Sequence, residues 1–227
     1  NGMKRGLQMT ESREWVAKNC LVSQVDLVNT MGTDKTVVNS ARVSYANDNR
    51  VSEEVTDKDK KLISYLAEHK HLSPFNHCFA SFKVDAPIFV ARQLVKHEYL
   101  VWNEVSRRYT DKDLSVFRAG VWYAQATTNK QGSAKPLKSN LQYMCTEIYE
   151  NAMYTAFNCY KALLRTGVSR EDARMVLPQS AMTSWYWSGS LGAFAKMCNL
   201  RLDSHTQHYT REVAVLIDQV MAKKYPI

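Results

Sequence analysis

Residues 92–109 of this 227-residue chain read RQLVKHEYLVWNEVSRRY. An ordinary surface helix keeps its charged residues on one side and an apolar stripe on the other. In this stretch the apolar stripe is clear only as far as Val95, and beyond it charged and amide groups alternate with apolar residues. The pattern is typical of a polar cluster partly sunk into protein, where fixed hydrogen-bond donors receive an anion.

The first polar group in this stretch is Gln93, Lys96 and His97. Their spacing of i, i+3 and i+4 predicts that they share one face of a helix. Glu104 follows them and supplies a carboxylate that can orient the edge of a base or a guanidinium.

The second polar group is Ser106, Arg107 and Arg108, which follow a short non-helical link. A hydroxyl close to planar guanidinium forks is suited to binding a phosphate. The alternative interpretation of the whole stretch is a solvated, charged helix end beside a buried Trp102, and composition alone does not decide between them.

The order of these residues resembles the signature of the flavin-dependent thymidylate synthases. That signature reads Arg-His-Arg, seven residues, Ser, and then Arg-Tyr two residues on, a spacing that this chain shares. The matching residues here are Lys96, His97 and Glu98, then Ser106, Arg108 and Tyr109. Similar stretches follow in the family's order over residues 20–224: MGTDKTVVNSARVSY (31–45), HLSPFNH (71–77), VDAPIFVARQ (84–93), EDARMVLP (171–178) and CNLRLDSHTQ (198–207).

Length and composition are those of one globular domain, with 45% hydrophobic and 23% charged residues. We therefore expect residues 1–227 to form a single domain, with 1–6 read as a tag remnant. No apolar run approaches the roughly 18 residues of a membrane span. The net charge of +8 favours anionic ligands such as nucleotides, folates or nucleic acid.

The five cysteines are odd in number and include no CxxC pair, which favours reduced core cysteines and a cytoplasmic location. No Pro-Cys pair occurs, so methylation of uracil by this chain would proceed without a cysteine nucleophile. His205 and His208 have no third ligand nearby in the sequence, and no metal site is predicted.

Apolar periodicity predicts the remaining elements. Strands are expected at 20–28, 79–84 and 180–189. Helices are expected at 34–42, 56–70, from Pro87 into the signature, 141–165, 169–177, 191–200 and from Ser204 onward. Caps are expected from Thr56 with Asp59, Ser169 with Asp172 and Ser204 with Gln207. The apolar period of 141–165 includes Met144 and Ile148. The polar residues 124–140 are expected to form a mobile surface loop without regular structure. The pattern, with the resemblance, predicts an α+β fold in which helices flank a small, mostly antiparallel sheet.

The resemblance implies an activity and its cofactors. Enzymes of that family convert dUMP to dTMP with FAD, NADPH and methylenetetrahydrofolate, as homotetramers whose active sites lie where subunits meet. Arg201 is implied as the catalytic residue, because its guanidinium would stabilise negative charge that develops on the uracil. Arg174 is implied to reach the nucleotide from a neighbouring subunit. The residues implied to bind dUMP are Gln93, Lys96, Glu104, Ser106, Arg107, Arg108, Arg174 and Arg201.

The FAD contacts implied by the resemblance include positions where this chain departs from the family. They are Ser44, His71, Ser73, Lys96, His97, Glu98, Glu104 and Ser190. Of these, Lys96, Glu98 and Ser190 differ from the common pattern, and Gly192 stands where the family has an arginine. Lys196 lies four residues beyond Gly192 on the same expected helix, so it is predicted to supply the missing positive charge.

Two other functions stay open at this level. The same nucleotide site could transfer a different one-carbon unit, such as hydroxymethyl, to a pyrimidine deoxynucleotide. A basic nucleic-acid-binding protein is disfavoured, because the basic residues are spread along the chain and carboxylates are mixed into the signature.

Overall fold

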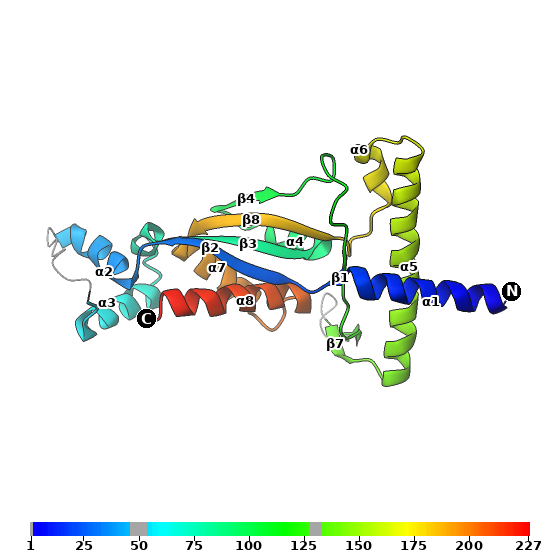
Figure 1. Ribbon diagram of the computed structural model, residues 1–227. Helices are drawn as coiled ribbons and strands as arrows, with labels where there is room; N and C mark the ends of the chain where they lie inside the picture. Colours follow the sequence, from blue (N-terminus) through cyan, green and yellow to red (C-terminus); the bar gives the residue numbers. More distant parts are fainter. Residues whose placement is uncertain (1, 46–53, 128–132) are drawn as a thin grey trace. The chain divides into compact units, whose positions relative to one another are not determined.

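The computed structural model describes residues 2–45, 54–127 and 133–227 (Figure 1). The chain forms two compact units. Unit 1 comprises residues 1–23, 85–93 and 104–184, and unit 2 comprises residues 24–84, 94–103 and 185–227. Because the chain passes repeatedly between the units, each one is assembled from separate parts of the sequence. The single domain expected from length stays a prediction.

Unit 1 is built on a long helix, α5 (Ser139–Arg165), against which α1 (Gly2–Asn19) packs. The strands β1 (Cys20–Leu21) and β5 (Val116–Phe117) pair in parallel, and the hydroxyl of Ser12 donates to the Asn151 side chain over 2.9 Å. The buried core of this unit is made by Val16, Val116, Met153, Phe157 and Ala181.

The helix α5 does not bury the apolar stripe that its sequence suggests. Its buried residues are Met153, Phe157 and Tyr160. Met144 and Ile148, on the face of the longer apolar period, are 49% and 63% exposed. The sequence gives this helix two apolar faces, and the structure shows which of them meets the core.

Residues 124–140 are not the structureless loop expected from their polarity. The strands β6 (Tyr123–Gln125) and β7 (Ser133–Pro136) pair in antiparallel, with Tyr123 opposite Pro136 and Gln125 opposite Ser133. Residues 128–132 lie outside the described part. After α5, Ser169 caps α6 (Arg170–Ala173) as expected, but the helix stops at Ala173 and a 3-10 turn, η3 (Arg174–Val176), follows.

Unit 2 holds most of a four-stranded sheet with the order β2-β3-β8-β4. The strands are β2 (Gln24–Met31), β3 (Phe79–Pro87), β4 (Leu100–Glu104) and β8 (Met182–Ser190). Alternate residues of β3 and β8 are buried, as expected for strands with one face on a core. Aromatic rings fill that core, and Trp102 stacks on Trp185 with a centroid separation of 4.3 Å.

The helices of unit 2 are α2 (Asp34–Arg42), α3 (Asp57–Glu68), α7 (Leu191–Arg201) and α8 (His208–Lys224), with the 3-10 turns η1 (Val43–Tyr45) and η2 (Pro74–His77). α8 packs on β2 and α7 (Figure 1). The Thr56–Asp59 capping box of α3 is confirmed. The cap expected from Ser204 is wrong, because α8 begins after Gln207. The predicted α+β class, with helices flanking a small sheet, is confirmed.

The signature itself is not one helix. α4 (Ile88–Leu94) ends before Lys96 and His97, which lie in the turn that leads to β4. The helical face expected to unite Gln93 with Lys96 and His97 is therefore wrong. The turn reaches β4 through Tyr99, whose φ of 65° no α-helix accommodates.

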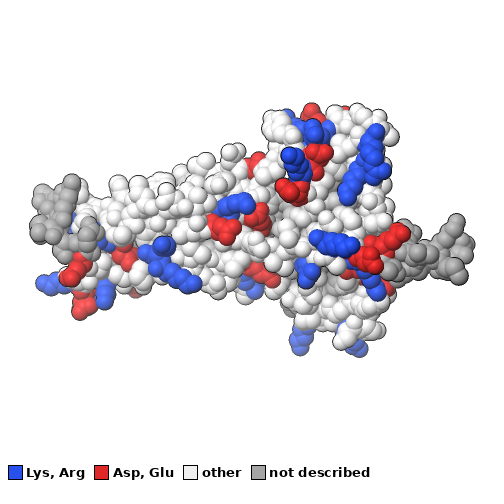
Figure 2. Space-filling model, viewed as in Figure 1, with Lys and Arg blue, Asp and Glu red and all other residues white. Residues whose placement is uncertain are grey.

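Charged side chains on the face shown in Figure 2 are mixed in sign, with carboxylates beside most groups of Lys and Arg. A continuous basic stripe is the usual footprint of a nucleic-acid-binding surface, and the absence of nucleic-acid binding stays a prediction. In the described part of the chain, no helix is both long enough and apolar enough to cross a membrane.

Candidate active site

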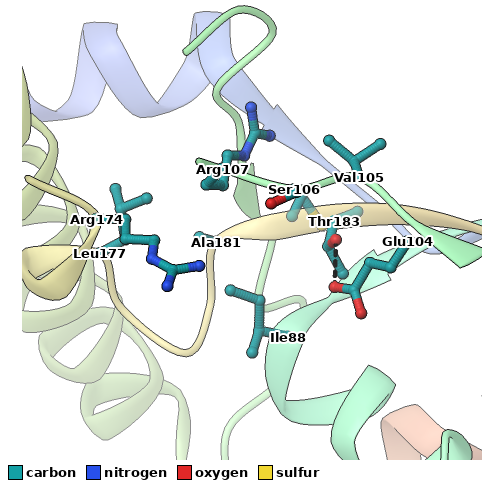
Figure 3. A pocket seen from close by; sticks show the side chains of 10 residues that line it. Ile88, Glu104, Val105, Ser106, Arg107, Arg174, Leu177, Ala181 and Thr183 are labelled. Atoms are coloured by element: carbon teal, nitrogen blue, oxygen red, sulfur yellow. Dashed lines mark hydrogen bonds between the residues drawn. The ribbon is translucent and has the colours of Figure 1, made fainter. Parts of the chain in front are cut away.

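A cavity of about 360 Å³ in unit 1 brings together residues from both halves of the sequence (Figure 3). It is lined by Ile88, Glu104, Val105, Ser106, Arg107, Arg174, Leu177, Ala181, Met182 and Thr183. Four of these were predicted to bind the nucleotide: Glu104, Ser106, Arg107 and Arg174. We call this cavity the signature pocket.

The strands β4 and β8 position the carboxylate and hydroxyl side of the signature pocket. Glu104 ends β4, and its carboxylate accepts a hydrogen bond of 2.6 Å from the hydroxyl of Thr183 (Figure 3). The amide of Val105 donates to the carbonyl of Ser184 over 2.9 Å, which carries the strand pairing on to Ser106. The hydrogen bond from Thr183 thus restricts the orientation of the Glu104 carboxylate, which lines the pocket.

The two arginines of the pocket are used differently. The guanidinium of Arg107 donates to the carbonyls of Lys112 and Asp113, and burial lowers its pKa. Arg174 is exposed; its Nε donates to the carbonyl of Glu171, and its terminal nitrogens extend into the pocket (Figure 3). Arg174 therefore suits an anionic ligand, whereas Arg107 shapes the wall. Arg174 and Ser106 line the same cavity within one chain, and the delivery of Arg174 to the site of a neighbouring subunit stays a prediction.

In unit 2, Arg201 and His97 form a second pair of predicted residues. Nε of Arg201, the last residue of α7, donates to Nε2 of His97 over 2.8 Å. Burial, with the nearby charges of Arg201 and Lys196, lowers the pKa of His97 to about 4. His97 is thus neutral near pH 7, and because Nε2 accepts, its proton is on Nδ1. The imidazole fixes the position of a guanidinium that burial has partly desolvated.

The low pKa of His97 predicts a pH dependence of stability. The unfolded histidine takes up a proton below about pH 6.5, whereas the folded one resists until about pH 4, so the folded state loses stability as the pH falls between these values. His97→Gln removes this titration. We expect the wild type to lose about 1 kcal/mol more than the variant between pH 7 and pH 5, after allowance for solvent screening. Urea unfolding at both pH values measures it, and equal losses would contradict a neutral His97.

A second cavity, of about 330 Å³, lies within unit 2. It is lined by Leu72, Asn76, Phe79, Tyr99, Ser190, Gly192, Ala193 and Lys196, and we call it the helix pocket. Ser190 caps α7 and donates to Asn76 Oδ1 over 2.8 Å. A Cβ atom at Gly192 would lie 2.6 Å from the same oxygen. The lack of a side chain at Gly192 therefore leaves room for the Asn76 amide. Lys196 places a positive charge in the lining of this pocket.

Several predicted residues line neither pocket. Arg108 is exposed, with its guanidinium 5.3 Å from the ring centroid of Tyr109. Arg201 and His97, described above, also lie outside both linings. The others are Gln93 in α4, Lys96 and Glu98 in the turn after it, Ser44 in η1, and His71 and Ser73 before η2. His71 lies near the rings of Tyr65 and His69.

Thr183, Asn76 and Tyr99 are pocket residues that the sequence did not single out. Asn76 lies inside the HLSPFNH stretch and Tyr99 inside the seven-residue gap of the signature. Their position within these motifs was the only sequence feature that could have marked them as site residues. Among the described residues no three His, Cys, Asp or Glu gather in a metal-binding arrangement. His205 instead contacts Asp203, and His208 contacts Glu212.

The family model described as thymidylate synthase complementing protein, Thy1, matches residues 26–227. The chain belongs to the flavin-dependent thymidylate synthase family. Curated members include the enzyme of Thermosipho melanesiensis, 36% identical over 88% of this chain and 86% of its own, and that of Thermosipho africanus, 38% identical over the same shares.

A solved structure shares the fold. The UMP/dUMP methylase PolB from Streptomyces cacaoi, crystallised with 5-Br UMP, superposes with a TM-score of 0.80 at 27% identity over 92% of both chains. The predicted family, fold class and enzyme class are therefore confirmed. The comparisons leave the roles of individual residues as predictions.

Proposed function

We propose that this member of the family methylates dUMP reductively to dTMP, with FAD as cofactor and NADPH and methylenetetrahydrofolate as co-substrates. The observation that carries the proposal is the signature pocket, where Arg174 meets Glu104 and Ser106 from a distant part of the sequence. A carboxylate that accepts hydrogen bonds and an arginine with a hydroxyl are the two kinds of group that a pyrimidine nucleotide requires.

Each group in the signature pocket has a role in this proposal. The carboxylate of Glu104, held by Thr183, accepts a hydrogen bond from the N–H edge of the uracil. Ser106 and Arg174 bind the phosphate. Arg107 does not bind it and instead holds the following loop through the carbonyl of Lys112. Gln93, Lys96 and Arg108 stay predicted contacts from outside the pocket lining.

Arg201 is the proposed catalytic residue. A guanidinium acts more strongly on a nearby charge when water is removed from around it. Arg201 is partly buried, and this burial lowers its pKa. His97 holds it through Nε, so the group needs little reorganisation when negative charge develops on the ring.

The helix pocket supports the flavin assignment. Its lining offers a cation, a hydroxyl, an amide and apolar walls, which together match the phosphate, sugar and ring parts of a flavin nucleotide. The small residue at 192 leaves room beside the start of α7. A bound flavin would supply the redox chemistry of the transfer. Ser190 and Lys196 are proposed contacts here, and Ser44, His71, Ser73, Lys96, His97, Glu98 and Glu104 stay predicted ones.

A homotetramer is part of the proposal. The exposed face of α5 supports it, because Met144, Ile148, Ala152 and Cys159 follow one another at helical spacing with no charged residue in the row. A second copy of the chain is the expected occupant, since self-association would bury this face. Sedimentation of Ile148→Glu beside the wild type tests it, and an unchanged oligomeric state would exclude this face. A cytoplasmic location stays a prediction.

The absorption spectrum of the purified protein tests the cofactor assignment. We expect the visible bands of an oxidised flavin, and we expect NADPH to bleach them. Mass analysis of the product from dUMP, with UMP as a parallel substrate because PolB is a UMP/dUMP methylase, separates methyl from hydroxymethyl transfer and deoxyribose from ribose. A protein that binds no flavin, or a product that carries no methyl group, would overturn the proposal.

Ser106→Ala should weaken dUMP binding and leave turnover measurable, because Ser106 is proposed as a phosphate ligand and not as a nucleophile. Loss of a hydrogen bond to a charged group costs about 1.5–3 kcal/mol. Calorimetric titration gives the dissociation constant, and Ser133→Ala, an exposed serine of the same unit, is the control. A covalent adduct of dUMP on Ser106, detected by mass spectrometry, would contradict this role.

A further inference from the structure

Tyr99 has an unusual backbone conformation. Its φ is 65°, in the left-handed region that bulky residues rarely adopt. Tyr99 is also 80% exposed. An exposed aromatic ring contributes little to a core, so packing does not explain why a tyrosine occupies this position. Strained residues of this kind gather at ligand sites, where the surrounding structure holds them.

The sheet holds the backbone of Tyr99 in place. A Cβ atom at Gly189, in β8, would lie 2.8 Å from the carbonyl oxygen of Tyr99 and 2.5 Å from Cδ2 of Leu100. Glycine at 189 therefore permits the turn to lie directly against the strand. With the backbone fixed there, the ring of Tyr99 is presented at the helix pocket, whose lining it joins.

Lys196 lies at the same side of the helix pocket. Its Nζ is 6.0 Å from the centroid of the Tyr99 ring, at the outer limit of a cation–π contact. Its charge also acts on His97, so the ammonium lies close to both aromatic groups. Ring and ammonium thus lie together in the pocket lining, which also includes the small residues that begin α7.

The chemistry of this edge selects a class of ligand. A flat ring with an ammonium beside it suits a ligand that has both a planar aromatic system and negative charge. The volume of about 330 Å³ lies at the low end of the roughly 300–1,000 Å³ of small-molecule sites, so it holds one end of a dinucleotide. The flavin nucleotide of the proposed function has two such ends.

We infer that Tyr99 is a flavin-binding residue of this chain: its ring stacks on a planar ring of the flavin nucleotide in the helix pocket, and Lys196 pairs with the adjoining negative charge. The inference rests on the proposed function. The ring at 99 and the ammonium at 196 act as a unit, which offsets the absence of an arginine at Gly192.

Titration of the flavin-free protein with FAD tests this inference, with the dissociation constant and the flavin fluorescence as readouts. Tyr99→Asn should raise the dissociation constant at least tenfold and reduce quenching, because the stacked ring is lost. Its thermal stability should not fall, because asparagine adopts a positive φ more readily than tyrosine. Tyr99→Phe, which keeps the ring, should bind within about threefold of the wild type. Tyr186→Leu, at an exposed tyrosine of the same unit, is the control.

Two further arms complete the design. The effect of Lys196→Ala with Tyr99→Asn should be smaller than the product of the two single effects, because the two groups act together. FMN and ADP, titrated separately, show which end stacks: a loss confined to FMN identifies the flavin ring, and one confined to ADP identifies adenine.

The outcomes separate the two claims. If the wild type binds FAD and Tyr99→Asn binds it equally well, this inference is wrong and the proposed function stands. If Tyr99→Phe loses as much affinity as Tyr99→Asn, the hydroxyl and not ring stacking is responsible, which also overturns it. If the wild type binds no flavin, the proposed function fails and the inference fails with it.

Discussion

Arg201→Ala should reduce the rate of dTMP formation by about a hundredfold or more while the protein stays folded. The loss of one preorganised group that stabilises developing charge costs on the order of 3 kcal/mol of transition-state stabilisation. Arg201 is held by His97 and is partly desolvated, and both properties make its charge effective. Single-turnover measurement with bound flavin reports the chemical step directly.

A second readout separates catalysis from structure in this experiment. The charge of Arg201 is one cause of the low pKa of His97, so its removal should move that pKa upward from about 4, which an NMR titration detects. Arg201→Lys keeps the charge but loses the planar fork and should fall between the wild type and the alanine variant. Lys223→Ala, an exposed charge in the same unit, is the control. Near-normal dTMP formation by Arg201→Ala would refute the catalytic assignment.

Sequence patterns predicted the parts of the fold whose signals are local. The capping box of Thr56 and Asp59 satisfies two backbone donors within four residues, so its meaning does not depend on the rest of the chain. The helix over 34–42 and the aromatic strand near 180–189 were found for the same reason. Convergence of Ser106 and Arg174 was implied only by family resemblance, because no local pattern relates residues so far apart.

The errors arose where two local choices have similar energies. In α5 both faces carry apolar residues, and packing against α1 and the rest of the unit 1 core decides that Met153 and Phe157 are the buried ones. Beyond Leu94 no glycine or proline marks the helix end; the turn depends on Tyr99, and Gly189, in another strand, leaves room for it. Tertiary contacts of this kind override propensity and are not written in neighbouring residues.

A buried charge cluster in unit 2 links α2 and α3. The side chain of Asp59 is 1% exposed and accepts hydrogen bonds from Lys35, over 3.0 Å, and from Arg42. Burial acts to raise the pKa of Asp59, but the hydrogen bonds from Thr56 and Lys35 and the charge of Arg42 hold it well below its usual range. Lys35 also donates to the carbonyl of Glu54, so this α2 side chain contacts both α3 and the segment that precedes it.

Asp59→Asn should therefore destabilise the protein by about 3–5 kcal/mol, because it leaves Lys35 buried and both cations without their counter-charge. Asp57→Asn, in the same helical turn but with its side chain 93% exposed, should change stability by no more than about 0.5 kcal/mol. Urea unfolding at pH 7 measures both.

The wild type should itself lose this contribution as the pH falls below about 4, since the folded carboxylate stays charged after the unfolded one has become protonated. Because α2 leads directly to Ser44, a flavin affinity that falls in Asp59→Asn and not in Asp57→Asn would tie the cluster to the cofactor site. Equal stabilities of the two variants would show that the cluster does not hold these helices together.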